Sequence, residues 1–211
     1  SLIRTEATGY GCVYFAQEML HHIGEDIRGK VCVVSGSGNV AQYTAEKVIE
    51  LGGKVISFSD SSGTVYDEEG VTEEKLNFVK DLKNNRHGRI KEYAEKYNVP
   101  FYEGKTPWHI KCDIAFPSAT QNELNITDAK ELVKNGCICI AEGSNMGSTP
   151  EAIHYFRETK TLFGVSKAAN AGGVAVSGLE MAQNRMGYSW TREDLDERLK
   201  NIMKKIHQQC L

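Results

Sequence analysis

The sequence lacks several features that mark common classes of protein. Its six cysteines form no Cys-x-x-Cys pair, and no histidine stands at a zinc-like spacing, so neither a structural zinc site nor a dithiol redox centre is indicated. No apolar run is long enough to cross a bilayer, which argues against a membrane protein. The net charge is only −3 at pH 7, so no basic surplus favours nucleic acid or an anionic membrane.

The chain also has no internal repeat and no low-complexity linker. We therefore expect residues 1–211 to form one domain, with a core drawn from an apolar content of 40%. Four cysteines lie in apolar, strand-like runs: Cys32, Cys112, Cys137 and Cys139. Buried, reduced thiols of this kind are typical of a cytosol-like compartment, so we expect a cytoplasmic protein, or an organellar one if the source is eukaryotic.

Short apolar strands alternate with helical patterns along most of the chain. The expected strands are 31–35, 55–59, 113–117, 137–141 and 162–165, with a small hairpin within 60–70. The expected helices are 39–51, 72–84, 88–97, 127–135, one from 149, 173–186 and 191–206. This alternation predicts an α/β fold with a doubly wound parallel sheet, the Rossmann-like dinucleotide-binding architecture.

A glycine-rich turn joins the first expected strand to the first expected helix, in the order Gly36-Ser37-Gly38-Asn39-Val40-Ala41. The first glycine permits a tight turn, the second lets the backbone approach a pyrophosphate, and Ala41 allows close packing of helix on strand. The pyrophosphate would sit on the helix N-terminus. We interpret this turn as a dinucleotide site, the alternative being a turn that serves packing alone.

The residues after the second expected strand bear on which dinucleotide would bind. Asp60 ends that strand, where an acid usually accepts hydrogen bonds from the adenosine ribose and disfavours a 2′-phosphate, as in NAD sites. Ser61 follows, and Lys83, Arg86 and Arg89 lie further on; hydroxyl and basic groups suit the 2′-phosphate of NADP. The alternative for Lys83 and Arg86 is a solvated polar face.

Polar residues also follow later strands, at the sheet edge where open α/β folds bind ligands. They are Ser118-Ala119-Thr120-Gln121, Glu142-Gly143-Ser144-Asn145-Met146 and Asn170. Asn170 begins a glycine-rich stretch, 170–184, whose bare helix start would attract carboxylates and carboxamides.

Six segments together resemble the glutamate dehydrogenases over essentially the whole chain. They are RTEATGYG (4–11), VSGSGNVAQ (34–42), SDSSGT (59–64), PSATQNEL (117–124), EGSNM (142–146) and KAANAGGVAVSGLEMAQN (167–184). The Ser-Asp-Ser-Ser-Gly order, with Lys83 and Arg86 downstream, resembles the NADP-dependent branch, which makes NADP the expected cofactor and NAD the less favoured one.

The resemblance implies a role for each matching residue. The nicotinamide ribose or carboxamide would be contacted by Thr8, Asn145 and Asn170, with Ala119 and Thr120 packed beside them. The pyrophosphate would be lined by Gly36, Ser37, Gly38, Asn39 and Val40, and the adenosine ribose with its 2′-phosphate would be surrounded by Asp60, Ser61, Lys83 and Arg86. The end of the glutamate side chain would be touched by Val174 and Ser177. For Ser177 the alternative is a hydroxyl bonded back to the carbonyl of Gly173, with no substrate contact.

The resemblance also implies what the 211 residues do not contain. In this family the catalytic Lys and Asp belong to an N-terminal domain, so we expect no catalytic residue and no metal ligand here, and we interpret the chain as the cofactor domain of a longer two-domain enzyme. The implied partners are L-glutamate, 2-oxoglutarate and ammonia, and the implied assembly of the intact enzyme is a homohexamer. The alternative is a stand-alone nucleotide-binding module with a regulatory role and no catalysis.

Overall fold

The computed structural model describes residues 3–187 and 189–211. Its main sheet consists of five parallel strands. In spatial order they are β2 (Lys54–Val55), β1 (Val31–Val34), β6 (Ile114–Phe116), β7 (Cys139–Ala141) and β8 (Leu162–Gly164). The central strands are buried on both faces, which is why they read as unbroken apolar runs. The predicted doubly wound parallel sheet is confirmed.

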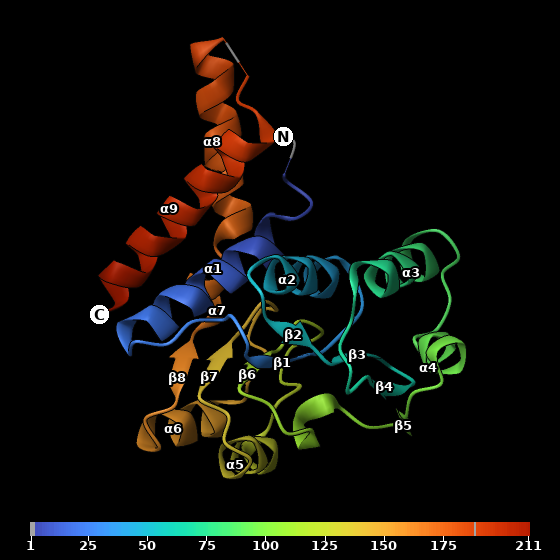
Figure 1. The fold of residues 1–211 in the computed structure, drawn as a ribbon. Helices are drawn as coiled ribbons and strands as arrows, with labels where there is room; N and C mark the ends of the chain where they lie inside the picture. Colours follow the sequence, from blue (N-terminus) through green and yellow to red (C-terminus); the bar gives the residue numbers. More distant parts are fainter. Residues whose placement is uncertain (1–2, 188) are drawn as a thin grey trace.

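Helices cover both faces of this sheet (Figure 1). The helices α1 (Ala7–His22) and α2 (Asn39–Glu50) lie on one face, and α5 (Ile126–Lys134), α6 (Pro150–Glu158) and the 3-10 helix η1 (Pro107–His109) lie on the other. Side chains fix two of these helix starts: Asn125 and Asp128 form a capping box on α5, and the Thr149 hydroxyl caps α6 ahead of Pro150. The loops after β6 and β7 therefore end at defined points.

A second, antiparallel sheet contains β3 (Ser57–Asp60), β4 (Gly63–Tyr66) and β5 (Phe101–Glu103), with α3 (Glu73–Asn84) and α4 (Lys91–Tyr97) connecting β4 to β5. The predicted hairpin is the β3–β4 pair. The single strand predicted over 55–59 is wrong, because the chain changes sheets at Ile56: Val55 pairs with β1, whereas Ser57 pairs with β4. The change brings Asp60, at the end of β3, beside Lys83 of α3.

The helix α1 was not predicted. Most of its residues are buried, including the glycines Gly9 and Gly11, so it has no polar stripe to reveal a helical period. Its glycines allow close packing. A Cβ on Gly9 would lie 2.7 Å from the backbone nitrogen of Thr44 in α2, and one on Gly11 would lie 3.0 Å from the Cα of Gly172.

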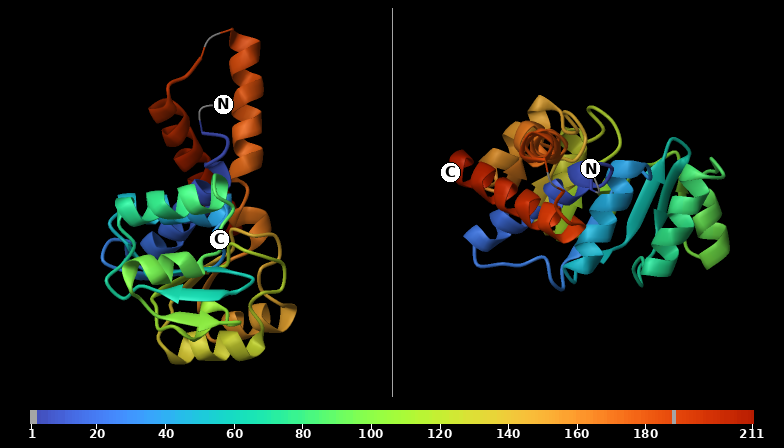
Figure 2. Two further views of the ribbon diagram at one scale, coloured as in Figure 1. Left: turned by 90° about the vertical axis from the view of Figure 1, so that its right-hand side faces the viewer. Right: turned by 90° about the horizontal axis from the view of Figure 1, so that it is seen from above.

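The last three helices form an arm that rises from the main body and returns (Figures 1 and 2). The short helix α7 (Ser166–Ala169) leads into α8 (Gly172–Met186), and α9 (Arg192–Cys210) folds back across α1. Buried Lys47 of α2 helps to hold α9, with its ammonium 2.9 Å from the Asp196 carboxylate and 4.3 Å from the Tyr10 ring centre. The helix α8 was predicted within one residue.

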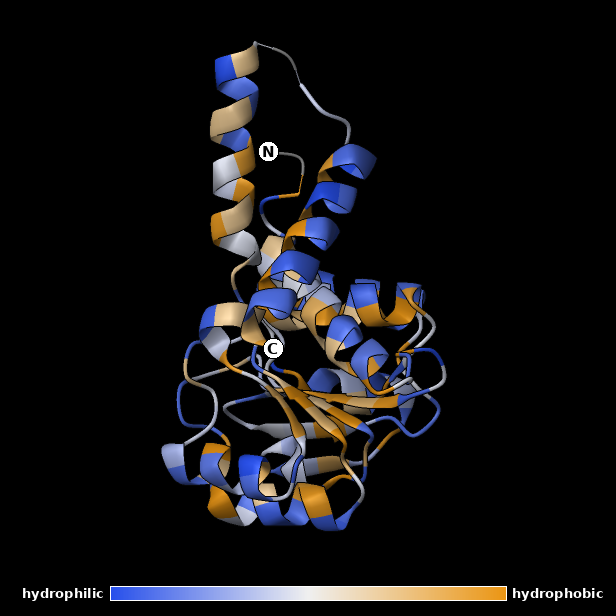
Figure 3. Ribbon diagram, turned by 90° about the vertical axis from the view of Figure 1, so that its left-hand side faces the viewer, coloured by the Kyte–Doolittle hydropathy of each residue, from blue (hydrophilic) through white to orange (hydrophobic). Residues whose placement is uncertain are grey.

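The hydrophobic core lies between the sheet and its covering helices, and the outer faces of those helices are polar (Figure 3). The prediction that Cys32, Cys112, Cys137 and Cys139 are buried thiols is confirmed, and Cys12 is buried as well. Within residues 3–187 and 189–211, no helix combines the length and apolar character needed to cross a membrane.

Candidate functional site

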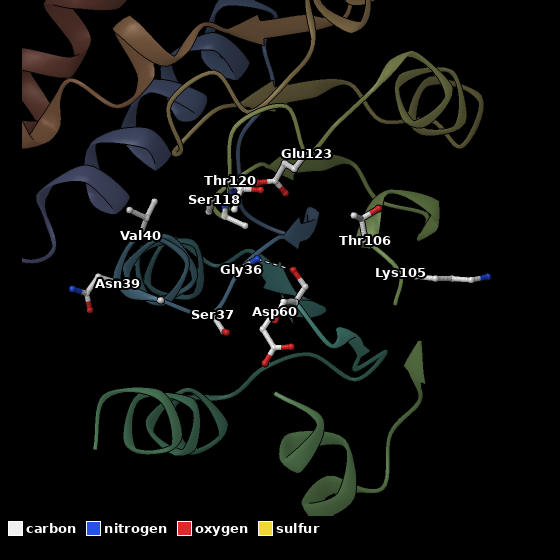
Figure 4. A pocket seen from close by; sticks show the side chains of 14 residues that line it. Gly36, Ser37, Asn39, Val40, Asp60, Lys105, Thr106, Ser118, Thr120 and Glu123 are labelled. Atoms are coloured by element: carbon white, nitrogen blue, oxygen red, sulfur yellow. Dashed lines mark hydrogen bonds between the residues drawn. The ribbon is translucent and has the colours of Figure 1, made fainter. Parts of the chain in front are cut away.

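A groove of about 610 Å³ opens at the carboxyl edge of the main sheet, where the chain leaves β1 and β6 (Figure 4). The connections from these two adjacent strands run in opposite directions across the sheet, to β2 and to β7, and such a switch point is where open α/β sheets bind ligands. The lining residues are Gly36, Ser37, Gly38, Asn39, Val40, Ser59, Asp60, Ser61, Lys105, Thr106, Ser118, Ala119, Thr120 and Glu123.

The glycine turn forms one wall of the groove. Gly36 has a φ of 79°, in the left-handed region that favours glycine, and a Cβ there would lie 2.9 Å from the carbonyl oxygen of Ser118. The helix α2 begins at Asn39, and its N-cap residue Gly38 supplies no side-chain cap. The first N–H groups of α2 therefore face the groove without a side-chain partner, an arrangement that suits a phosphate group.

The loop after β6 forms the facing wall, and Glu123 shapes it. A Glu123 carboxylate oxygen accepts hydrogen bonds from the N–H groups of Ala119 and Thr120, each at 2.9 Å. Burial raises the pKa of Glu123, and the hydrogen bonds from Ser35, Thr120 and Ala119 oppose that rise. Glu123 was not predicted as a site residue, and its only sequence signal was its place in the segment 117–124.

Asp60 stands at the end of β3 with its oxygens already engaged. They accept hydrogen bonds from the N–H of Ile90 at 2.7 Å, the N–H of Ser62 at 2.8 Å and the ammonium of Lys83 at 2.8 Å. Burial works against the charge of Asp60, but these bonds outweigh it and hold its pKa at about 2. A ribose hydroxyl would have to compete for an oxygen that is already satisfied, so Asp60 is a weaker argument for NAD than its position suggested.

The structure separates the three basic residues that follow. Lys83 is bound to Asp60 and to the carbonyl of Gly88. The guanidinium of Arg89 donates to the hydroxyl of Ser61 and lies 3.3 Å from Asp60. Arg86 instead pairs with Asp81 at 2.9 Å and lies 3.8 Å from Glu92, with its guanidinium over the Phe78 ring.

Arg89, rather than Arg86, is therefore the arginine beside the groove, although only Arg86 was assigned to the site from the sequence. The left-handed residue His87, with a φ of 51°, and Gly88 lie between the two arginines. This segment lies outside α3 and α4 and separates the two arginines.

The remaining predicted residues gather at the start of the arm. The side-chain amide of Asn170 donates to the amide oxygen of Asn145 at 2.6 Å, so two loops that are distant in sequence meet here. Thr8 lies beside the start of α8, since a Cβ on Gly173 would be 3.0 Å from the Thr8 hydroxyl oxygen. Val174 is 79% exposed. The Ser177 hydroxyl donates to the carbonyl of Gly173 at 3.2 Å, which is the back-bonded alternative described above.

The model of the glutamate/leucine/phenylalanine/valine dehydrogenase family matches residues 1–211. The chain belongs to this family. It is 62% identical over 211 residues to a glutamate dehydrogenase from Bacteroides thetaiotaomicron, covering 100% of this chain and 48% of the relative. It is 52% identical over 211 residues to the NADP-specific glutamate dehydrogenase of Escherichia coli, covering 100% of this chain and 47% of that protein. The chain thus spans about half the length of these relatives.

The solved structure of glutamate dehydrogenase 2 from Plasmodium falciparum has the same fold. Its TM-score with this chain is 0.96 at 50% identity, covering 99% of this chain and 46% of that one. An NAD(P)-specific glutamate dehydrogenase from Xylanibacter ruminicola is 55% identical over 211 residues, covering 100% of this chain and 48% of that relative. The names of the relatives therefore differ in the cofactor that they specify.

Proposed function

We propose that this chain is the NADP-binding domain of a glutamate dehydrogenase. The enzyme would be longer than this chain and would reversibly deaminate L-glutamate to 2-oxoglutarate and ammonia. One observation carries the proposal: the uncapped start of α2 and the Gly36 turn meet at the switch point of the parallel sheet, above a groove of about 610 Å³. The proposal includes a cytoplasmic homohexamer as the intact enzyme.

The groove and the start of the arm would bind different parts of the cofactor. The N–H groups at the start of α2, with Ser37, Asn39 and Val40 around them, would bind the pyrophosphate. Ala119 and Thr120 would pack along the ribose toward the Asn145–Asn170 pair, which with Thr8 would orient the carboxamide. When bound, the cofactor supplies the nicotinamide ring that accepts or donates the hydride.

Charge supports NADP over NAD at the adenosine end. Asp60 contributes one negative charge, whereas Lys83 and Arg89 bring two positive charges to the same place. Ser61, which lines the groove, adds a hydroxyl that can bond to phosphate. A 2′-phosphate would draw the cations of Lys83 and Arg89 away from Asp60, which would keep its hydrogen bonds from the N–H groups of Ile90 and Ser62.

The 211-residue chain by itself is expected to bind the cofactor without glutamate-dependent turnover. The titratable side chains lining the groove are Asp60, Lys105 and Glu123, and both carboxylates are engaged by N–H groups. Proton transfer by a positioned group contributes about 10²–10⁴-fold to such reactions. The measurement is the absorbance of NADPH formed in a mixture of the chain, glutamate and NADP. Reduction of NADP above a blank without protein would contradict this expectation.

Ser177→Ala in the intact enzyme is expected to lower the preference for glutamate over norvaline by roughly 10- to 100-fold, the value of one hydrogen bond to a charged group. In this structure the hydroxyl bonds to Gly173, so substrate would have to draw it away from that carbonyl. The measurement is kcat/KM for both amino acids. An unchanged ratio would assign Ser177 to helix structure alone.

A further inference from the structure

A second buried carboxylate lies behind the Asn145–Asn170 pair. Glu142 directly follows β7 and is 1% exposed. Its Oε1 accepts a hydrogen bond from the N–H of Ser166 at 3.0 Å, and its Oε2 accepts one from the N–H of Ser148 at 2.5 Å. Burial raises the pKa of Glu142, and the hydrogen bonds from Ser148, Ser166 and Gly147 oppose that rise. A charge held out of water in this way needs such donors.

The two oxygens of Glu142 join two separate parts of the chain. Ser148 ends the loop that carries Asn145, whereas Ser166 begins α7, which leads directly to Asn170. Ser166 strengthens the same junction, because its hydroxyl accepts a hydrogen bond from the N–H of Met146 at 3.2 Å. The Asn170–Asn145 hydrogen bond of 2.6 Å is a further link between the same two parts of the chain.

The space around Glu142 leaves little room for another arrangement. A Cβ on Gly147 would lie 2.8 Å from the hydroxyl of Ser144 and 3.3 Å from Oε2 of Glu142. The carbonyls of Met146 and Gly147 are held by the N–H groups of Asn122 and Leu124, at 2.8 and 3.1 Å. The loop is therefore fixed from both sides, and Glu142 provides its inner attachment.

Glu142 is also separate from the adenosine end of the groove. It is not among the residues that line the groove, and its carboxylate binds the N–H groups of Ser148, at the end of the loop after β7, and of Ser166, at the start of α7. Glu142 also acts electrostatically on Glu123, which lines the groove. A change at Glu142 therefore reaches the groove through the segments of Ser148 and Ser166 and through Glu123. The adenosine end depends on Asp60, at the end of β3 in the other sheet, and on Lys83 of α3 and Arg89, which pair with it.

We propose that Glu142 is a positioning residue for the nicotinamide end of the cofactor, acting by holding the loop of Asn145 and the start of α7 together so that Asn145 and Asn170 form one binding surface. This proposal rests on the proposed function, because it takes the two asparagines as the carboxamide contacts. Glutamine at this position keeps the shape but has one acceptor oxygen and an NH₂ group, so one of the two loop N–H groups would face a donor.

The test compares two probes on the 211-residue chain by calorimetric titration: NADPH, and adenosine 2′,5′-bisphosphate, which lacks the nicotinamide half. Glu142→Gln is expected to weaken NADPH by about 10-fold, the loss of one charge-assisted hydrogen bond, and to leave the bisphosphate within about twofold. The fluorescence of bound NADPH is expected to shift toward that of the free form. Glu158→Gln, at an exposed site on α6, is the matched control and is expected to change neither affinity.

Two further variants separate positioning from a general effect on folding. Ser166→Ala keeps Glu142 and removes only the acceptor for the Met146 N–H, so it is expected to give the same selective loss at smaller size. Lys83→Ala is expected to weaken both probes. If Glu142→Gln weakens both probes equally, or changes the affinity of neither, the positioning role of Glu142 is overturned. In that case the proposed function still stands as long as the wild-type chain binds both probes. A wild-type chain that binds neither probe would overturn the proposed function and, with it, this proposal.

Discussion

Replacing Lys83 and Arg89 together by alanine is expected to weaken NADPH binding on the order of 100-fold while changing NADH binding less than about threefold. A hydrogen bond to a charged group contributes about 1.5–3 kcal/mol, and each 1.4 kcal/mol is about tenfold in affinity. Lys83 is the more buried of the two, with 15% of its side chain exposed against 53% for Arg89, so Lys83 is expected to contribute the larger share. The double variant also leaves Asp60 uncompensated beside the phosphate.

Arg86→Ala is the matched control for this experiment. Its guanidinium pairs with Asp81 and Glu92, so its loss is expected to change NADPH affinity less than about twofold, within the usual range for exposed ion pairs. Fluorescence titration of NADPH and NADH against all variants measures the contrast. A large effect of Arg86→Ala together with none from Arg89→Ala would restore the assignment made from the sequence and contradict the one made from the structure.

Gly172→Ala is expected to lower the free energy of unfolding by about 3 kcal/mol, the upper part of the range for overpacked sites. Gly172 is the first residue of α8, and a Cβ there would lie 2.1 Å from the carbonyl oxygen of Ala7 in α1. Because the obstacle is backbone, the methyl group can be accommodated only by moving α8 away from α1. Such a movement would also carry Asn170 and Ser177 out of place.

Gly178→Ala in the same helix provides the comparison. A Cβ at Gly178 meets no atom within 4 Å, and alanine is a better helix former by about 1 kcal/mol, so this variant is expected to be as stable as the wild type or slightly more stable. Urea denaturation followed by circular dichroism gives both values. Equal effects of the two substitutions would show that α8 does not depend on its contact with α1.

The main sheet and the glycine turn could be predicted from the sequence because their signals are local. A buried parallel strand is a short apolar run, and the Gly36 turn joins such a run to a segment with the apolar spacing of a helix. The change of sheets at Ile56 has no such signal, since Val55 and Ser57 belong to one β-rich run and only their partners differ. The same is true of α1, whose all-round burial hides its period.

The candidate site divides in the same way. Residues that act through the backbone turn, such as Gly36 and Gly38, are placed by their motif. Arg89 and Glu123 lie in segments outside the helices and strands, where the direction of a side chain has no local sequence signal. Ser177 shows the limit of a resemblance, because the role implied by the family does not reveal that its hydroxyl has a partner in its own helix.

The most direct test of the account is a fluorescence titration of the 211-residue chain with NADPH and NADH in parallel. The account predicts saturable binding of NADPH, with a Kd at least about tenfold lower than that of NADH, since at least one charge-assisted contact to the 2′-phosphate separates the two cofactors. Failure of the folded chain to bind NADPH, or binding of NADH as tightly as NADPH, would contradict it.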